Sequence, residues 1–184
     1  MKKQSGFTLI ELVMVTLIAA LLVVGGLHIL GFVTKTTFYL PNQVRADTLA
    51  ADALEILTEG DKTAKGLRFC KAVTTAGANQ VIVTNQDDQT IEYRLTAGKL
   101  YRKIATGADA LVPYYMPADM TIAGVGGSLF TYTDASDAPL TQPVTPANVR
   151  RIKVDLIAKN GTGSSDTLDG TSTQSSSVKV NKYL

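Results

Sequence analysis

The sequence predicts an α+β fold, in which a long amino-terminal helix packs on an antiparallel β-sheet. Two observations support this prediction. No formally charged side chain occurs in the 23 residues between Glu11 and Lys35, and a helical pattern then continues to about Glu59. After Gly66 the spacing of apolar residues changes from the 3.6-residue period of a helix to the two-residue alternation of strands. The chain therefore divides into a helical first part and a β-rich remainder.

The first half of the predicted helix, residues 7–36, is apolar enough to span a membrane. A helix rises 1.5 Å per residue, so about 20 apolar residues cross a bilayer. Gly25, Gly26 and Gly31 interrupt this run, and each lowers helix propensity by about 1 kcal/mol relative to alanine. Glu11 is a carboxylate at the end of an otherwise apolar helix, so we expect it to have a partner.

The second half of the helix is predicted to be amphipathic. Pro41 lacks a backbone N–H, so we expect the helix to kink or restart there. From Asn42 to about Glu59 the pattern is helical, and Gly60 is predicted to end it. Its apolar residues lie at i, i+4, i+7 and i+8, a stripe that would face a core: Leu49, Ala53, Ile56 and Leu57.

Strands are predicted wherever apolar and polar residues alternate. The first three are 80–84, 91–95 and 99–104, and the turn Ala97-Gly98 should join the last two as a hairpin. Further strands are predicted at 121–123, 128–133, 151–156 and 178–181. Residues 160–177 are almost wholly Gly, Ser, Thr and Asp, so we expect a long flexible loop there.

Composition limits the classes of function. The chain has 18 basic and 16 acidic side chains, and removal of Lys2 and Lys3 would leave 16 of each. A domain of balanced charge attracts nucleic acid weakly, so we do not expect nucleic acid as a partner. Cys70 is the only cysteine, which excludes an intrachain disulfide. We interpret it as a small buried apolar residue rather than as a reactive thiol.

The sequence contains no pattern typical of an enzyme. His28 is the sole histidine and lies in the membrane helix, which excludes a histidine-dependent triad in the remaining domain. No His/Cys cluster could bind zinc, and the glycines at 124–127 suit a turn rather than a phosphate loop. We therefore expect no catalytic residue and no cofactor. Carboxylates in polar loops leave calcium open as a weaker alternative: Asp87, Asp88, Asp134, Asp137, Asp166 and Asp169.

The sequence also leaves open the role of a pair of aromatic residues. Tyr114 and Tyr115 lie between Pro113 and Pro117. They could form a contact surface, or they could simply pack inside the domain.

The amino-terminal motif is the most specific feature of the chain. Met1-Lys-Lys-Gln-Ser-Gly6 precedes Phe7-Thr-Leu-Ile-Glu11 and the apolar run. At these residues the chain resembles the type IV pilin-like superfamily of pilins and pseudopilins. The resemblance implies a leader at residues 1–6, cleavage after Gly6, N-methylation of Phe7 and an assembly role for Glu11, the fifth residue after cleavage. It also implies that the glycine-containing stretch can unwind in a filament; close packing of helices in lipid is the alternative role for these glycines.

A secretory signal peptide or a plain signal anchor would also start with basic and then apolar residues. The apolar run here is about twice as long as a usual signal-peptide core, and its end lacks a clear small-x-small cleavage site. Neither alternative explains Glu11, five residues after Gly6. We therefore prefer the pilin-like interpretation.

The resemblance implies a non-enzymatic structural protein with three parts: the leader 1–6, a transmembrane and assembly helix 7–36, and an exported domain 37–184. We expect it in the inner membrane as a single-pass protein, amino terminus in the cytoplasm, and then in a filament. The expected partners are prepilin peptidase/methylase, other pilins or pseudopilins, the inner-membrane assembly platform and the lipid bilayer. In the filament, the resemblance implies that Glu11 meets the terminal amine of a neighbouring subunit.

Within this class we expect a minor subunit that primes or caps assembly of a type IV pilus or type II secretion pseudopilus. The hairpin 91–104 and the strand 151–156 look like features of J-type minor pseudopilins and W-type minor pilins. The polar stretch 160–177 also looks poorly suited to tiling a filament. A major filament subunit and a DNA-binding competence minor pilin are the alternatives. The sequence leaves open which machine the protein serves.

Overall fold

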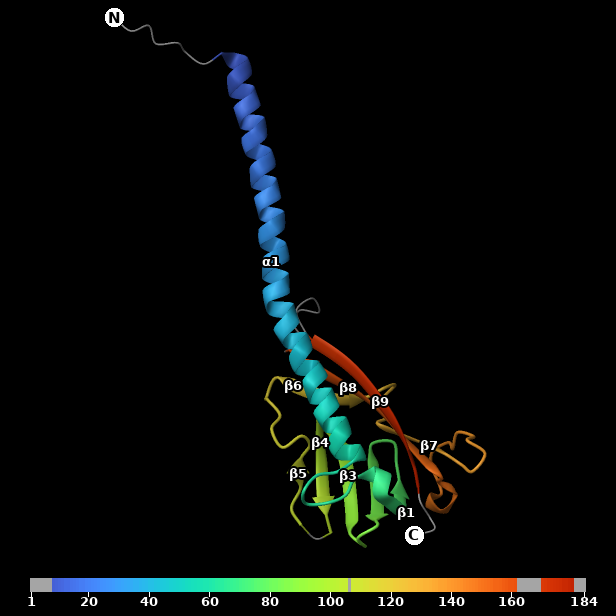
Figure 1. Ribbon diagram of the computed structural model, residues 1–184. Coiled ribbons are helices and arrows are strands. Elements are labelled where there is room, and N and C mark those ends of the chain that lie inside the picture. The colour runs from blue at the N-terminus through green and yellow to red at the C-terminus, as the bar shows by residue number, and fades with distance from the viewer. Residues whose placement is uncertain (1–7, 106, 162–169, 181–184) are drawn as a thin grey trace, which may run out of the picture.

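The fold consists of one long helix whose second half packs on β-structure (Figure 1). The computed structural model describes residues 8–105, 107–161 and 170–180, and only the backbone of Phe38. The helix, α1 (Leu9–Thr58), projects far beyond the domain at its amino-terminal end (Figure 1). The predicted α+β class, with a long helix on antiparallel strands, is confirmed.

Helix α1 runs through Pro41 without interruption, so of the two outcomes expected there, a kink or a restart, the restart is wrong. Figure 1 shows one helix that bends gently along its length. Side chains immediately after the proline bind the strands: Asn160 Nδ2 donates to Asn42 Oδ1 at 3.0 Å, and the Gln43 amide bonds both the N–H (3.1 Å) and the C=O (2.8 Å) of Thr171. These contacts hold this part of the helix against the sheet.

The carboxyl-terminal end of α1 was predicted correctly. Gly60 follows the cap residue Glu59 with φ +89°, and its N–H donates to Ile56 O at 3.1 Å. This is the left-handed helix end that favours glycine. The face turned to the core is formed by Ala46, Leu49, Ala50, Ala53 and Leu57, with Ile56 half-buried beside it.

The first sheet is an antiparallel meander in chain order: β1 (Cys70–Ala76), β2 (Gln80–Asn85), β3 (Thr90–Thr96), β4 (Lys99–Ile104) and β5 (Ala110–Leu111). The predicted hairpin is β3–β4, and its turn residues Ala97 and Gly98 both have positive φ, 49° and 71°, as a type I′ turn requires. Strands β1 and β5 were not predicted. β1 changes register twice against β2, which breaks the alternation of burial that would reveal it.

The second sheet is built around β8 (Arg151–Asn160). Strand β9 (Gly170–Lys179) pairs with β8 along its whole length on one side. On the other side, β6 (Met120–Gly124) pairs with residues 156–160, and β7 (Phe130–Thr133) pairs with residues 151–154. Short 3-10 helices at Leu67–Phe69 and Pro146–Asn148 complete the described elements.

Strand β9 corrects the prediction of a flexible loop at 160–177, which is wrong from Gly170 onward; residues 162–169 lie outside the described residues. Its stability comes from the backbone ladder with β8 and from close packing against α1, neither of which needs apolar side chains. A Cβ atom on Gly170 would lie 2.1 Å from the backbone oxygen of Asn42, so only glycine allows the helix to approach this closely. A polar strand can therefore support the helix directly.

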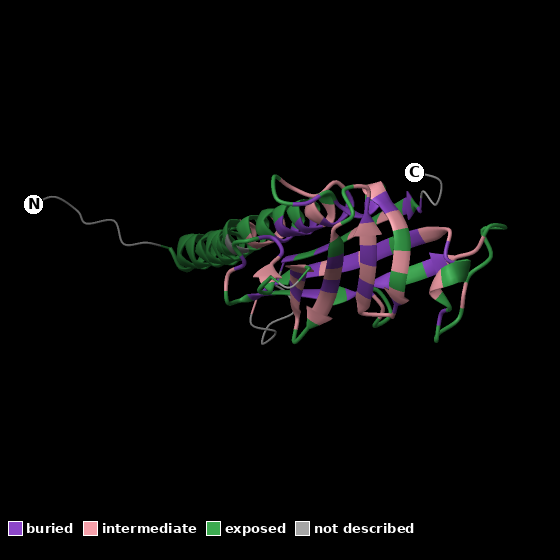
Figure 2. Cartoon of the chain, turned by 90° about the horizontal axis from the view of Figure 1, so that it is seen from below, coloured by how far each residue is buried: buried purple, intermediate pink, exposed green. Residues whose placement is uncertain are grey.

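One hydrophobic cluster joins the helix to both sheets of the described chain. Tyr93, Tyr132 and Phe130 are its largest buried side chains, and the Tyr132 hydroxyl donates to Gly77 O at 2.8 Å. Cys70 is fully buried in the cluster, which confirms its interpretation as a core residue. Figure 2 shows the buried residues alternating along the strands, whereas the projecting helix is exposed all round.

Candidate functional site

The amino-terminal half of α1 is an apolar surface with no other part of the described chain packed on it. Its large apolar side chains are exposed from Leu9 (83%) to Val33 (53%) (Figure 2). An 18-residue window of the helix has a mean hydropathy of 2.5, and none of that window is buried. By length and composition this helix could cross a membrane. Such a surface needs lipid or other apolar helices around it.

Thr8 and Glu11 cap the start of this helix through reciprocal hydrogen bonds. Glu11 Oε2 accepts from the Thr8 N–H at 2.9 Å and from its hydroxyl at 3.0 Å, while Thr8 Oγ1 accepts from the Glu11 N–H at 3.4 Å. This arrangement is a capping box. The spacing Thr8-x-x-Glu11 is typical of one, so the motif could have been predicted from the sequence, but it was missed. The carboxylate also suits the positive end of the helix dipole. The other predicted site residues, Gly6 and Phe7, lie outside the described residues.

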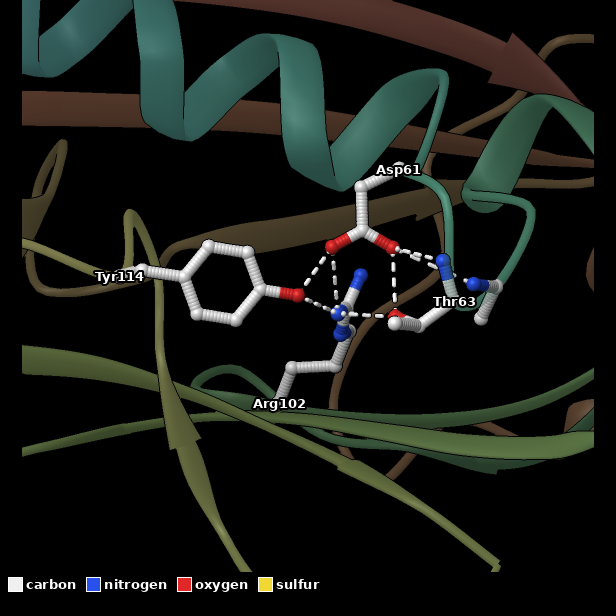
Figure 3. A network of polar contacts seen from close by, with 5 residues as sticks. Asp61, Thr63, Arg102 and Tyr114 are labelled. Atoms are coloured by element: carbon white, nitrogen blue, oxygen red, sulfur yellow. Dashed lines mark hydrogen bonds and ion pairs between the residues drawn. The ribbon is translucent and has the colours of Figure 1, made fainter.

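A second polar cluster ties together three segments of the domain (Figure 3). Asp61, just after α1, accepts on Oδ2 from Arg102 Nη2 of β4 at 2.8 Å and from the Tyr114 hydroxyl. Its Oδ1 accepts from the Thr63 N–H at 2.8 Å and the Thr63 hydroxyl at 2.6 Å. The Arg102 side chain is almost completely buried, 2% exposed, and the Asp61 side chain is 17% exposed. The cluster therefore joins the end of the helix to the first sheet and to the segment after β5.

The electrostatics of this cluster suit a structural contact. Burial opposes ionisation of Asp61, but hydrogen bonds from Arg102, Thr63 and Tyr114 outweigh it and hold the pKa of this carboxyl far below its usual range. Burial likewise lowers the pKa of Arg102, while the hydrogen bond and charge of Asp61 raise it above its normal value. A carboxylate of such low pKa is a weak base, and the arginine keeps its proton. The arrangement can fix two loops in place but is poorly matched to proton transfer.

The carboxylates considered for calcium have other partners where the structure describes them. Asp87 pairs with Lys65 at 2.9 Å, and Asp88 pairs with Lys71. Asp134 accepts backbone N–H groups of residues 136 and 138. The remaining described candidate pairs with an arginine: Asp137 Oδ1 lies 3.3 Å from Arg151 Nε. Asp166 and Asp169 lie outside the described residues. A cation at the described carboxylates would have to displace these partners.

Both tyrosines of the aromatic pair are exposed, so the structure does not support the alternative in which they pack inside the domain. The Tyr114 hydroxyl belongs to the Asp61 cluster, which fixes this side chain in place although 56% of the residue is exposed. Tyr115 is 82% exposed and, with Pro113 and Pro117, borders a groove of about 400 Å³ beside α1. It therefore remains available for a contact.

Residues 1–27 match the family model described as the prokaryotic N-terminal methylation motif. No curated protein and no solved structure matches the chain. The motif confirms the resemblance of the amino-terminal segment to the type IV pilin-like superfamily and, with the apolar helix, supports anchoring in a membrane. It does not separate the J-type and W-type subunits from the rest of that superfamily.

Proposed function

We propose that this chain is a non-enzymatic structural subunit of a type IV pilus or type II secretion pseudopilus. The observation that supports this most is the combination of the methylation motif at 1–27 with a half-helix whose apolar surface is exposed on all sides. Such a helix can reside in lipid before assembly and can pack with other apolar helices afterwards. The domain at its other end is a compact α+β unit that a filament could carry.

The proposed life cycle follows from the motif. Prepilin peptidase/methylase removes the leader 1–6 after Gly6 and methylates Phe7. The two lysines of the leader favour a cytoplasmic amino terminus under the positive-inside rule, with the domain outside the inner membrane. The assembly platform then extracts the chain into the filament.

Glu11 is proposed to join neighbouring subunits. Both contacts from Thr8 go to Oε2 of the carboxylate, so the described chain leaves Oε1 without a hydrogen bond. The terminal amine of a neighbour is a cation, and it stays basic after a single methylation. A carboxylate in an apolar bundle requires such a partner. The pair would set the axial register between helices.

A minor subunit that primes or caps assembly is our first candidate within this class, on the likeness of the β3–β4 hairpin and strand β8. The second candidate is a major subunit, and β9 favours it: the stretch from Gly170 is an ordered strand, so the argument that this region could not tile a filament no longer holds. A competence pilin that captures DNA is the alternative in another class; a mobility-shift titration against salt would test it.

Mass spectrometry of sheared filaments from the host tests the proposal. We expect a chain that begins at Phe7 and carries one added methyl group. Its abundance relative to other subunits ranks the two candidates, since a major subunit would dominate the preparation. A bulky residue in place of Gly6 should block cleavage. A mature chain that starts beyond residue 20 would indicate a conventional signal peptide and would refute the proposal.

A further inference from the structure

His28 is an ionisable residue on the exposed part of α1 with one unsatisfied ring nitrogen. We propose that it is a contact site at which the helix of a neighbouring filament subunit supplies an O–H or N–H donor to His28 Nε2. This inference rests on the proposed function, because it requires a neighbour within the helix bundle.

His28 lies within the hydrocarbon if α1 spans a bilayer. The nearest charged residues on the two sides are Glu11 and Lys35, and the midpoint between them is Val23. At 1.5 Å per residue, His28 lies about 7 Å from that midpoint, whereas the hydrocarbon extends about 15 Å to either side. Lysine and arginine can reach the headgroups from such positions, but imidazole is much shorter. An unsatisfied polar atom at this depth is unfavourable.

The hydroxyl groups of this part of the helix are satisfied within the chain. Thr8 and Glu11 bond each other, and the hydroxyls of Thr16 and Thr34 donate to backbone carbonyls three and four residues earlier. Between residues 8 and 34, where every residue is described, no hydrogen bond reaches Nε2 of His28 or Oε1 of Glu11, for which the neighbour's amine is already the proposed partner. Nε2 of His28 therefore requires a partner from outside the chain.

The contact made by the other ring nitrogen determines the chemistry of that partner. His28 Nδ1 lies 3.3 Å from Val24 O. A carbonyl oxygen can only accept, so in this contact Nδ1 carries the proton, and Nε2 of the neutral ring presents a lone pair. The matching group is a hydrogen-bond donor, such as a hydroxyl, an amide or a neutral carboxyl on another helix.

The surface around His28 allows another helix to approach. Gly25 and Gly31 lie three residues before and after it, so they flank it on the same face of the helix. A Cβ atom on either glycine would meet nothing within 4 Å in the described chain. Small residues of this kind let two helix backbones come close, which brings a donor on the neighbour within reach of Nε2.

Three substitutions test the contact in the native host. His28→Leu removes both nitrogens and makes the span more apolar, so membrane insertion and leader cleavage should persist. His28→Gln places an amide near the position of Nε2, whereas the shorter His28→Asn places it near Nδ1. Thr34→Val is the matched control, because the hydroxyl that it removes already donates to Leu30 O. Cleavage, membrane retention and incorporation into sheared filaments are measured separately for each.

We expect His28→Leu and His28→Asn to be cleaved and retained normally, but to be incorporated about 3- to 20-fold less than the wild type, as interhelical hydrogen bonds in membranes imply. His28→Gln should restore most of the incorporation, and Thr34→Val should match the wild type. Normal incorporation of His28→Leu, failure of His28→Gln, or equal rescue by Asn and Gln would each overturn the assignment. Absence of the wild-type chain from filaments would instead refute the proposed function.

Discussion

Replacing Asp61 by asparagine should destabilise the domain strongly, because it leaves the guanidinium of Arg102 buried without its anionic partner. Asparagine also places an NH₂ group opposite donors: Oδ1 of Asp61 receives two backbone N–H groups, and Oδ2 receives Arg102 and Tyr114. Whichever way the new amide is turned, its NH₂ group must therefore face N–H or O–H groups that also donate. The Asp61→Asn variant loses a charge and gains a mismatch with almost no change in size.

The magnitude follows from the burial of the remaining charge. Arg102 is 2% exposed, and its Nε and Nη1 have no hydrogen-bond partner among the described residues. Removing one partner of a buried ion pair costs about 3–5 kcal/mol. This is a large share of the roughly 5–15 kcal/mol by which domains are stable. For a domain of this size the melting temperature should fall by roughly 10–15 °C.

Thermal unfolding of the full chain in detergent micelles, followed by the circular dichroism of the sheets, measures this loss. The matched control is Asp87→Asn, which breaks the pair with Lys65; both side chains of that pair are about half exposed, 48% and 45%. An exposed pair contributes about 0–1 kcal/mol, so this melting temperature should move by no more than about 3 °C. Equal shifts in the two variants would refute the reasoning.

The loss of stability at low pH is an independent test of the contribution of Asp61. The pKa of Asp61 is lowered in the folded state, so its contribution is fully present above the unfolded pKa of about 3.9 and is lost as pH falls below it. The wild type should therefore lose stability steeply below about pH 4. The loss should be shallower in Asp61→Asn. Parallel acid profiles would show that this carboxyl is not a major source of the pH dependence.

Two further predictions concern the helix. Glu11→Ala should be cleaved and held in the membrane but should fail to enter filaments, and Glu11→Asp should be intermediate; a variant that is uncut, or that is cut and incorporated normally, rules out the assembly role. Gly170→Val should lower the melting temperature by several degrees, because its side chain would meet the backbone of Asn42. Thr173→Val, on the exposed face of β9, should melt like the wild type, and equal melting of both variants would show that the close approach is unimportant.

Elements determined by neighbouring residues could be predicted from the sequence. The exposed apolar half-helix follows from the absence of charged residues between Glu11 and Lys35. The β3–β4 hairpin follows from the alternation of apolar and polar residues on either side of Ala97-Gly98. The end of α1 at Gly60 follows from the need for a positive φ. In each case the interactions that stabilise the element connect residues close in sequence, so the pattern is visible locally.

Elements that depend on distant partners were missed. Strand β9 has few apolar residues and is ordered by β8 and α1, and the helix continues through Pro41 because residues beyond it bind strands more than 100 positions away. The Asp61 cluster joins residues 41 and 53 positions apart, so no local motif reveals it. Only the capping box of Thr8 and Glu11 was available in the sequence and overlooked.

The amide of Gln43 has a consequence for aggregation between chains. Strand β9 forms an edge of its sheet, and edges with unpaired backbone groups invite pairing with other chains. At Thr171 both the N–H and the C=O that point away from β8 are occupied by that single side chain. The Gln43 side chain thus blocks strand pairing at this position of the edge, and it would protect chains that are held close together, as proposed for the membrane, against strand-to-strand aggregation there.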